Sequence, residues 1–110
     1  MIRSGVMVIV VLASVGMASA APTTEAGMKV FADNKCGICH AVAGKGNVKG
    51  ALDGVGVKLS AAEIREWLVN APEMAVKAKA ARKPAMKSFA QLPKDEIDAL
   101  VTYLSTLKGK

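Results

Sequence analysis

The sequence predicts a single all-α domain, and three observations support this prediction. Apolar residues recur at helical intervals in the last part of the chain, helix-capping residues precede several segments, and no segment shows the alternation of a half-buried strand. The chain has 110 residues, enough for one small domain, and contains no internal repeat and no linker that would divide two domains.

The first predicted helix begins at Thr23 or Thr24 and ends near Asn34. Threonine is a favourable helix start because its hydroxyl accepts a hydrogen bond from a free backbone N–H of the first turn. Met28 and Phe31 are three residues apart, which places them on one side of this helix. We therefore expect both side chains in the core.

A glycine-rich segment and a second helix follow. Residues 41–59 contain five glycines and no sustained hydrophobic period, which predicts a long ordered loop. The sequence SAAE (Ser60 to Glu63) then matches a capping box. Trp67 lies at helical spacing with its apolar neighbours, so we expect it to pack in the core. The helix should end before Pro72, because the residue before proline is disfavoured in the α region.

The last helix has the clearest pattern in the chain. Pro93 suits a first helical position, and the acidic residues at 95 and 96 complement the positive end of the helix dipole. A buried stripe is predicted from the i, i+3, i+4, i+7 spacing of Ile97, Leu100, Val101, Leu104 and Leu107. Residues 73–79 carry a weaker helical pattern.

The first 20 residues have the pattern of a secretory signal peptide. Arg3 precedes an apolar run at 6–13, and small residues of the A-x-A type stand at 18–20. The run is shorter than the roughly 20 residues that span a membrane, so we expect cleavage after Ala20 and no stable membrane insertion. The remaining domain, residues 21–110, would work in the periplasm.

The most informative motif is CGICH (Cys36 to His40), which contains the only two cysteines and the only histidine of the chain. A thioredoxin-type pair needs a βαβ setting, which the sequence does not predict. A structural zinc site needs four ligands, and cysteine and histidine supply three here. A structural disulfide suits an exported protein, but it would close a very short loop and leave the histidine without a role.

Covalent attachment of haem uses all three reactive side chains. Each thiol adds across one vinyl group of the porphyrin, and the imidazole of the next residue reaches the iron. Because C-x-x-C-H is the signature of this attachment, the sequence predicts one haem c bound through Cys36 and Cys39, with His40 as an iron ligand.

The sequence resembles small class I cytochromes c of the bacterial monohaem type. The likeness covers nearly all of residues 21–110 and includes CGICH, the ALDGVG loop, the Trp67 helix, KPAMKSF and the final helix DEIDALVTYLSTL. It implies a cytochrome c fold with three to four helices around one covalently attached haem. It also implies that the first and last helices cross, so that Gly27 and Phe31 meet the region of Leu100, Tyr103 and Leu104.

Met86 is the predicted second axial ligand of the iron. The chain has no second histidine, which leaves methionine and lysine as candidates. Met28 lies just before the motif, with little chain to reach the opposite face of the haem, and is expected in the core; Met74 is expected to pack or to be exposed. Met86 is far enough along the chain to reach that face. Through Phe89 it matches the M-x-x-[F/Y] motif of the family, and a His/Met pair is associated with cytochromes c. Otherwise the sixth position is empty or filled by lysine.

Two residues depart from the family pattern. Lys87 stands where many relatives have proline after the methionine. Gly50 stands where many have a proline whose carbonyl accepts the ring N–H of the iron-bound histidine, and glycine retains that carbonyl. Because glycine fixes a loop less firmly than proline does, we expect Gly50→Pro to raise the melting temperature.

These features predict a soluble one-electron carrier in a respiratory or related redox chain, not an enzyme. Two protein ligands would occupy both axial positions of the iron, and no nucleophile–base pair stands out because the one histidine is assigned to the metal. The alternative is a haem c protein with an open or displaceable sixth site, which would act as a gas sensor or a peroxidase.

The excess of basic residues indicates what kind of partner the protein would bind. Without Arg3 the chain has 14 basic and 9 acidic residues, and a basic stretch free of acidic residues contains Lys77, Lys79, Arg82, Lys83 and Lys87. An ordinary solvated face is one interpretation; the other is a positive rim that attracts redox proteins with acidic docking surfaces. Nucleic acid binding is not expected for an exported chain with so few aromatic residues, and we expect a monomer.

Overall fold

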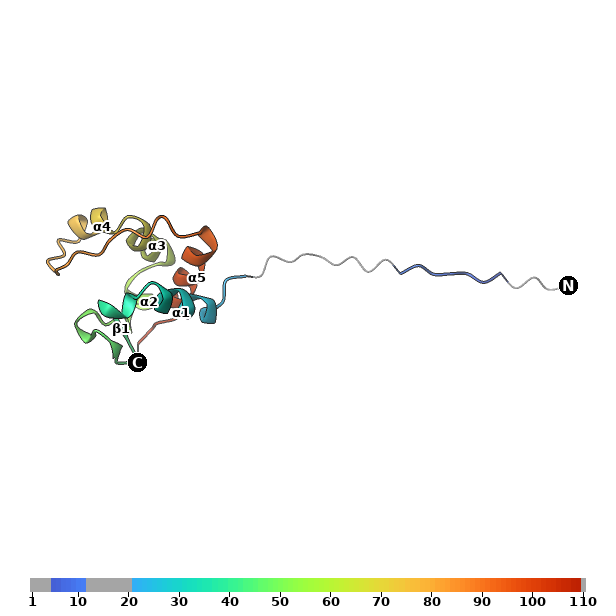
Figure 1. Ribbon diagram of the computed structural model, residues 1–110, viewed down its shortest axis with the longest axis horizontal. Coiled ribbons are helices and arrows are strands. Elements are labelled where there is room, and N and C mark those ends of the chain that lie inside the picture. Colours follow the sequence, from blue (N-terminus) through green and yellow to red (C-terminus); the bar gives the residue numbers. More distant parts are fainter. Residues whose placement is uncertain (1–4, 12–20, 110) are drawn as a thin grey trace.

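The computed structural model describes residues 5–11 and 21–109, and the part from Thr24 onward is mostly helical (Figure 1). Its elements are, in chain order, α1 (Thr24–Asp33), the 3₁₀ turn η1 (Cys36–Ile38), β1 (Ala41–Val42), β2 (Lys45–Gly46), the 3₁₀ turn η2 (Val48–Gly50), α2 (Val55–Lys58), α3 (Ala61–Val69), α4 (Ala71–Lys77) and α5 (Lys94–Ser105). The predicted all-α class is confirmed.

Part of the predicted signal peptide, including the cleavage site at Ala20, lies outside the described residues. Residues 5–11 have no regular secondary structure. Within the described ranges, no helix combines the length and the apolar character that a membrane crossing requires.

α1 and α5 cross closely, at a point where Gly27 leaves no room for a side chain. A methyl group on Gly27 would overlap the Ala99 carbonyl oxygen and the Cβ atom of Tyr103. One turn further on, the rings of Phe31 and Tyr103 meet edge to face, with centroids 5.8 Å apart and an interplanar angle of 89°. The helix crossing implied by the resemblance is therefore confirmed.

The caps of α1 and α3 form as the sequence predicts. The Thr23 hydroxyl accepts a hydrogen bond from the Ala26 N–H at 3.1 Å. At the start of α3, the Ser60 hydroxyl accepts from the Glu63 N–H at 3.2 Å, and the Glu63 carboxylate accepts from the Ser60 N–H at 3.0 Å. Each cap satisfies backbone donors that the first turn leaves free, so these residues fix where the helices begin.

α4 and α5 each begin close to a proline. α3 ends at Val69, and α4 begins directly afterwards with Pro72 in its first turn. α5 begins at Lys94, and Pro93 has extended backbone angles as its N-cap. The expectation that Pro93 is the first helical residue is wrong by one position.

The core is built around α5, which contacts both α1 and α3 (Figure 1). Leu100 is the most deeply buried large side chain, at 1% exposure. The cluster around it comprises Val30, Ile64, Leu68, Phe89, Ile97, Val101, Tyr103 and Leu104. Met28 is 51% exposed, so the expectation that it packs in the core is wrong. Its position on α1 turns away from α5, whereas Gly27 and Val30 face the helix crossing.

The glycine-rich segment is ordered, as predicted, but it also contains short elements that the sequence did not reveal. β1 and β2 form a two-stranded antiparallel hairpin, and the turn between them has positive φ angles at Ala43 (52°) and Gly44 (78°). The Asp53 carboxylate accepts a hydrogen bond from the Ala43 N–H at 2.7 Å. This bond closes the loop over the hairpin and stabilises the conformation of the turn.

Candidate functional site

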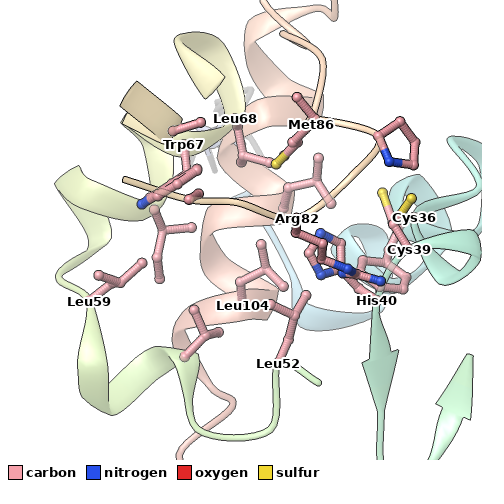
Figure 2. Close-up of a pocket in the computed structure, with 18 residues that line it drawn as sticks. Cys36, Cys39, His40, Leu52, Leu59, Trp67, Leu68, Arg82, Met86 and Leu104 are labelled. Atoms are coloured by element: carbon pink, nitrogen blue, oxygen red, sulfur yellow. The ribbon is translucent and has the colours of Figure 1, made fainter. Parts of the chain in front are cut away.

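A cavity of about 310 Å³ brings together the residues predicted to form the site (Figure 2). Cys36, Cys39, His40 and Met86 all line it. Most of the remaining lining is apolar and comes from α1, α2, α3, α5 and the loops: Phe31, Leu52, Val55, Leu59, Ile64, Leu68, Leu100 and Leu104. An apolar cavity with a few polar side chains is typical of a binding site for a small molecule or a cofactor.

The attachment motif forms a tight turn that gathers its three reactive side chains. Lys35 has a left-handed backbone (φ 55°), which ends the α1 segment and starts η1. The backbone N–H groups of Cys39 and His40 both donate to the Cys36 carbonyl, at 3.1 and 2.9 Å. The motif therefore closes on itself, so that both thiols and the imidazole reach the same cavity.

Both cysteines are half-buried free thiols. Burial raises the pKa of the Cys36 thiol above its usual value. Such a thiol remains protonated near neutral pH, whereas a redox-active C-x-x-C pair depends on a cysteine with a lowered pKa. This property disfavours a thioredoxin-type role and is compatible with addition of the S–H groups to a vinyl-bearing ring.

The His40 ring is oriented by a backbone carbonyl. Its Nδ1 atom lies 3.0 Å from the Gly50 oxygen, so the tautomer with a proton on Nδ1 donates to that carbonyl and leaves Nε2 as a lone-pair donor. A ligating histidine commonly has its second ring nitrogen held in this manner. The hydrogen bond expected between His40 and Gly50 is therefore present in the structure.

Asn47 holds the Gly50 loop against the attachment motif, a role that was missed from the sequence. Its side chain accepts from the Lys49 N–H at 3.1 Å and donates to the Ile38 carbonyl at 3.2 Å. Its backbone N–H is shared between the carbonyls of Gly37 and His40. The preference of asparagine for the residue before a helical turn was the available sequence signal.

Met86 approaches the cavity from the irregular segment before α5. In Figure 2 its side chain enters from the upper part of the view, whereas His40 lies at the lower right. Two contacts with the end of α3 fix this segment: the Phe89 N–H donates to the Leu68 carbonyl at 2.7 Å, and the Ser88 hydroxyl donates to the Val69 carbonyl at 2.6 Å. Burial of Phe89 in the core adds a third anchor.

The other methionines of the described chain do not line the cavity. Met28 is mostly solvent-exposed on α1, and Met74 lies on α4. Among the described methionines, Met86 alone lines the cavity that also contains His40.

These side chains fit an iron porphyrin better than a bare metal ion. Nowhere in the described part of the chain do three histidine, cysteine or acidic residues cluster as a metal site would require. Haem c is attached through two thiols, and its iron can be bound by an imidazole nitrogen and a thioether sulfur. The cavity offers all four groups, and its apolar walls suit the apolar ring. Cys36, Cys39, His40 and Met86 would hold such a group.

A family model described as Cytochrome c matches residues 24–108. The chain belongs to the cytochrome c family. Membership implies haem c as the cofactor and haem-based electron transfer as the general activity of this cytochrome c. A search of curated proteins and a search of solved structures each return no significant match.

Two further residues of this cytochrome c line the cavity. Trp67 is half-buried and lies on the cavity wall outside the central cluster, so it faces the cofactor space more than the core. Arg82 belongs to the basic stretch interpreted either as a solvated face or as a positive rim; the residue is exposed, and its side chain also lines the cavity (Figure 2).

The structure contradicts the expectation that Gly50→Pro would stabilise the protein. A Cβ atom at Gly50 would overlap the Cys39 carbonyl oxygen and the Arg82 guanidinium. The Gly50 N–H also donates to the Asn47 carbonyl at 3.0 Å, and proline has no N–H to make this bond. Glycine at this position is therefore required by close packing.

Proposed function

We propose that this cytochrome c is a one-electron carrier, not an enzyme. Cys36 and Cys39 would attach one haem c covalently, and His40 and Met86 would supply a nitrogen and a sulfur ligand to its iron. The observation that carries this proposal is that all four side chains, which come from two segments far apart in the sequence, line one apolar cavity.

The surrounding residues suit this activity. Bound haem supplies an iron that changes between the ferrous and ferric states. His40 is kept in a fixed orientation by Gly50, and the apolar walls limit water around the site. Met86 offers a thioether, a neutral soft ligand that favours the ferrous state more than an imidazole would. Ligands that stay in place during electron transfer keep the structural change small.

We further propose that the carrier is exported to the periplasm, works as a monomer in a respiratory or related redox chain, and docks on acidic redox proteins. Lys35, Ile38 and Lys45 line one shallow depression beside the attachment motif. Ile38 is 69% exposed and offers an apolar contact on this surface. An apolar contact flanked by lysines is suited to brief association with an acidic surface.

Mass spectrometry and visible spectroscopy of the purified protein test the haem assignment. We expect a mass increase of one haem that survives denaturation, a reduced-minus-oxidised spectrum of a low-spin c-type haem, and the near-infrared band of thioether-to-iron ligation. Absence of covalent haem would overturn the proposal. Free binding of carbon monoxide by the unmodified ferrous protein would replace it with the sensor or peroxidase alternative.

A further inference from the structure

Lys87 directly follows Met86, and its ammonium group lies on an aromatic ring. The Lys87 Nζ atom is placed over the ring of Phe89, 5.3 Å from the ring centroid. A cation within about 6 Å of the centroid is attracted by the negative charge of the ring face. Lys87 is exposed, does not line the cavity and forms no ion pair with any described residue. The ring of Phe89 is therefore the contact that holds this ammonium.

Phe89 is a fixed base for the contact. Its side chain is 8% exposed and belongs to the core cluster. Its backbone N–H donates to the Leu68 carbonyl at 2.7 Å, and its carbonyl accepts from the Leu92 N–H at 3.0 Å. Since Leu68 lies on α3, the position of the ring is set by the core and by that helix. A side chain that binds this ring is thereby held against the helical part of the fold.

The loop that carries Met86 has few other anchors. Over the described ranges, no hydrogen bond and no ion pair joins residues 81–87 to the remainder of the chain, and the flanking hydrogen bonds are at Ala80 and Ser88. Met86 itself is only partly buried, where it packs against the core cluster. Because so little else fixes the loop, one contact at residue 87 should measurably change how often Met86 leaves the cavity.

We propose that Lys87 is a positioning residue for Met86, because its ammonium, bound to the ring of Phe89, restricts the short backbone link between the methionine and the core. This inference rests on the proposed function, in which Met86 supplies the sulfur ligand. Lysine in an irregular segment otherwise has wide conformational freedom, so more open conformations become available when the contact is lost. Lys87 thus acts on the site through Met86.

The test measures how readily imidazole displaces Met86 in the ferric, haem-loaded protein. The buffer is mildly alkaline, so that imidazole is neutral while lysine stays charged. Imidazole binds only when the sixth position is free, so its apparent affinity rises with the fraction of open molecules. The near-infrared band of thioether ligation reports the loss of the sulfur in the same titration.

Three single variants separate the ring contact from a general effect of charge. Lys87→Gln should bind imidazole about two- to five-fold more tightly than the parent, the range that an exposed cation–π contact gives. Lys87→Arg keeps a cation for the ring and should stay near the parent value. Lys83→Gln is the matched control and should also stay near it, because Lys83 is an exposed cation of the same loop without an aromatic partner among the described residues.

Phe89→Leu removes the ring and keeps an apolar side chain in the core. In that background, Lys87→Gln should give no further gain in imidazole affinity. In the diamagnetic reduced parent, the ε-methylene protons of Lys87 should show a ring-current shift that disappears in Phe89→Leu. Should Phe89→Leu fail to mature, the comparison of Lys87→Gln and Lys87→Arg with Lys83→Gln still decides.

Equal imidazole affinities for Lys87→Gln and Lys83→Gln, or the same gain from Lys87→Gln with and without the Phe89 ring, would overturn the role of Lys87 alone. A Lys87→Arg variant that opens as readily as Lys87→Gln would do the same. A parent protein without the thioether band would overturn the proposed sulfur ligation as well, so the two failures are distinguishable.

Discussion

The imidazole Nδ1 of His40 lies 3.0 Å from the carbonyl oxygen of Gly50, and the rest of Gly50 is enclosed on its other side by Cys39 and Arg82. Gly50 thus orients His40 through its carbonyl, and because it has no side chain it leaves room for Arg82 beside it.

Gly50→Pro should lower the melting temperature of the haem-loaded protein. The ring would collide with the Cys39 carbonyl, and the hydrogen bond from the Gly50 N–H would be lost. Overpacking of this kind costs about 1–3 kcal/mol. Thermal unfolding followed by circular dichroism measures the change. Gly54→Ala is the control, because nothing lies within 4 Å of a Cβ atom there. A proline variant as stable as the parent would contradict this prediction.

Met86→Ala should open the sixth position of the iron. The cavity loses its thioether, so the near-infrared ligation band should disappear and the ferrous protein should bind carbon monoxide stoichiometrically. The reduction potential should also fall. Met74→Ala removes a methionine that does not line the cavity and should change none of these properties. An unchanged spectrum in Met86→Ala would mean that another group occupies the sixth position.

Gly27→Ala should destabilise the crossing of α1 and α5. The added methyl meets the Ala99 carbonyl and Tyr103 Cβ, and neither is the flexible end of a side chain, so the helices must separate. We expect a loss of about 2–3 kcal/mol in the free energy of unfolding, measured by denaturant titration. Met28→Ala on the exposed face of the same helix should cost much less, and equal losses would argue against this interpretation of the crossing.

Asp98 should make stability sensitive to acid. Its carboxylate pairs with Lys94 at 2.8 Å and with Arg65, and these two hydrogen bonds lower its pKa below the usual 3.8. Since the folded-state pKa is the lower one, the stabilisation is fully present above pH 3.8 and is lost as the pH falls through the folded value.

The measurement for Asp98 is unfolding free energy against pH for the parent and for Asp98→Asn. The two curves should differ most above pH 3.8 and converge in stronger acid. Asp33→Asn removes an acid from a single exposed pair with Lys29 and serves as the comparison. Parallel curves at every pH would show that the Asp98 pairs do not contribute to acid sensitivity.

Electron transfer to an acidic redox protein should slow as ionic strength rises. Lys35 and Lys45 lie beside exposed Ile38, and their attraction to an acidic surface is screened by salt. Charge reversal by Lys35→Glu should reduce the bimolecular rate at low salt by several-fold. Lys108→Glu, near the end of the chain, should reduce it less. A rate that is independent of salt would remove the docking proposal.

The sequence predicted most of the secondary structure because local chemistry determines it. Thr23 and the Ser60–Glu63 capping box define where helices begin, through hydrogen bonds within four residues of sequence. Such local patterns can be recognised in the sequence without knowledge of the tertiary structure. The short hairpin in residues 41–46 was not foreseen, because it depends on positive φ angles at Ala43 and Gly44 and on a distant partner, Asp53.

The uncommon CGICH motif contains three of the side chains that line the cavity, but the sequence did not predict the packing around them. Helical spacing put Met28 in the core, but two sides of α1 were available and the crossing with α5 selects the one that holds Gly27. Likewise, the sequence suggested that Gly50 fixes its loop less firmly than a proline would. Only the positions of Cys39 and Arg82, 11 and 32 residues away in sequence, reveal that it is tightly enclosed.

The contacts of Ser88 and Phe89 with the end of α3 have a consequence for motion. In the described structure, no hydrogen bond ties residues 81–87 to the remainder of the chain, so the stretch that carries Met86 is a loop held by hydrogen bonds only at its two ends, at Ala80 and Ser88. Swinging it outward would break far fewer interactions than global unfolding. Movement of the Met86 sulfur out of the cavity should thus be the earliest and most frequent local opening of the native protein, and α1 and α5 should remain packed while it occurs.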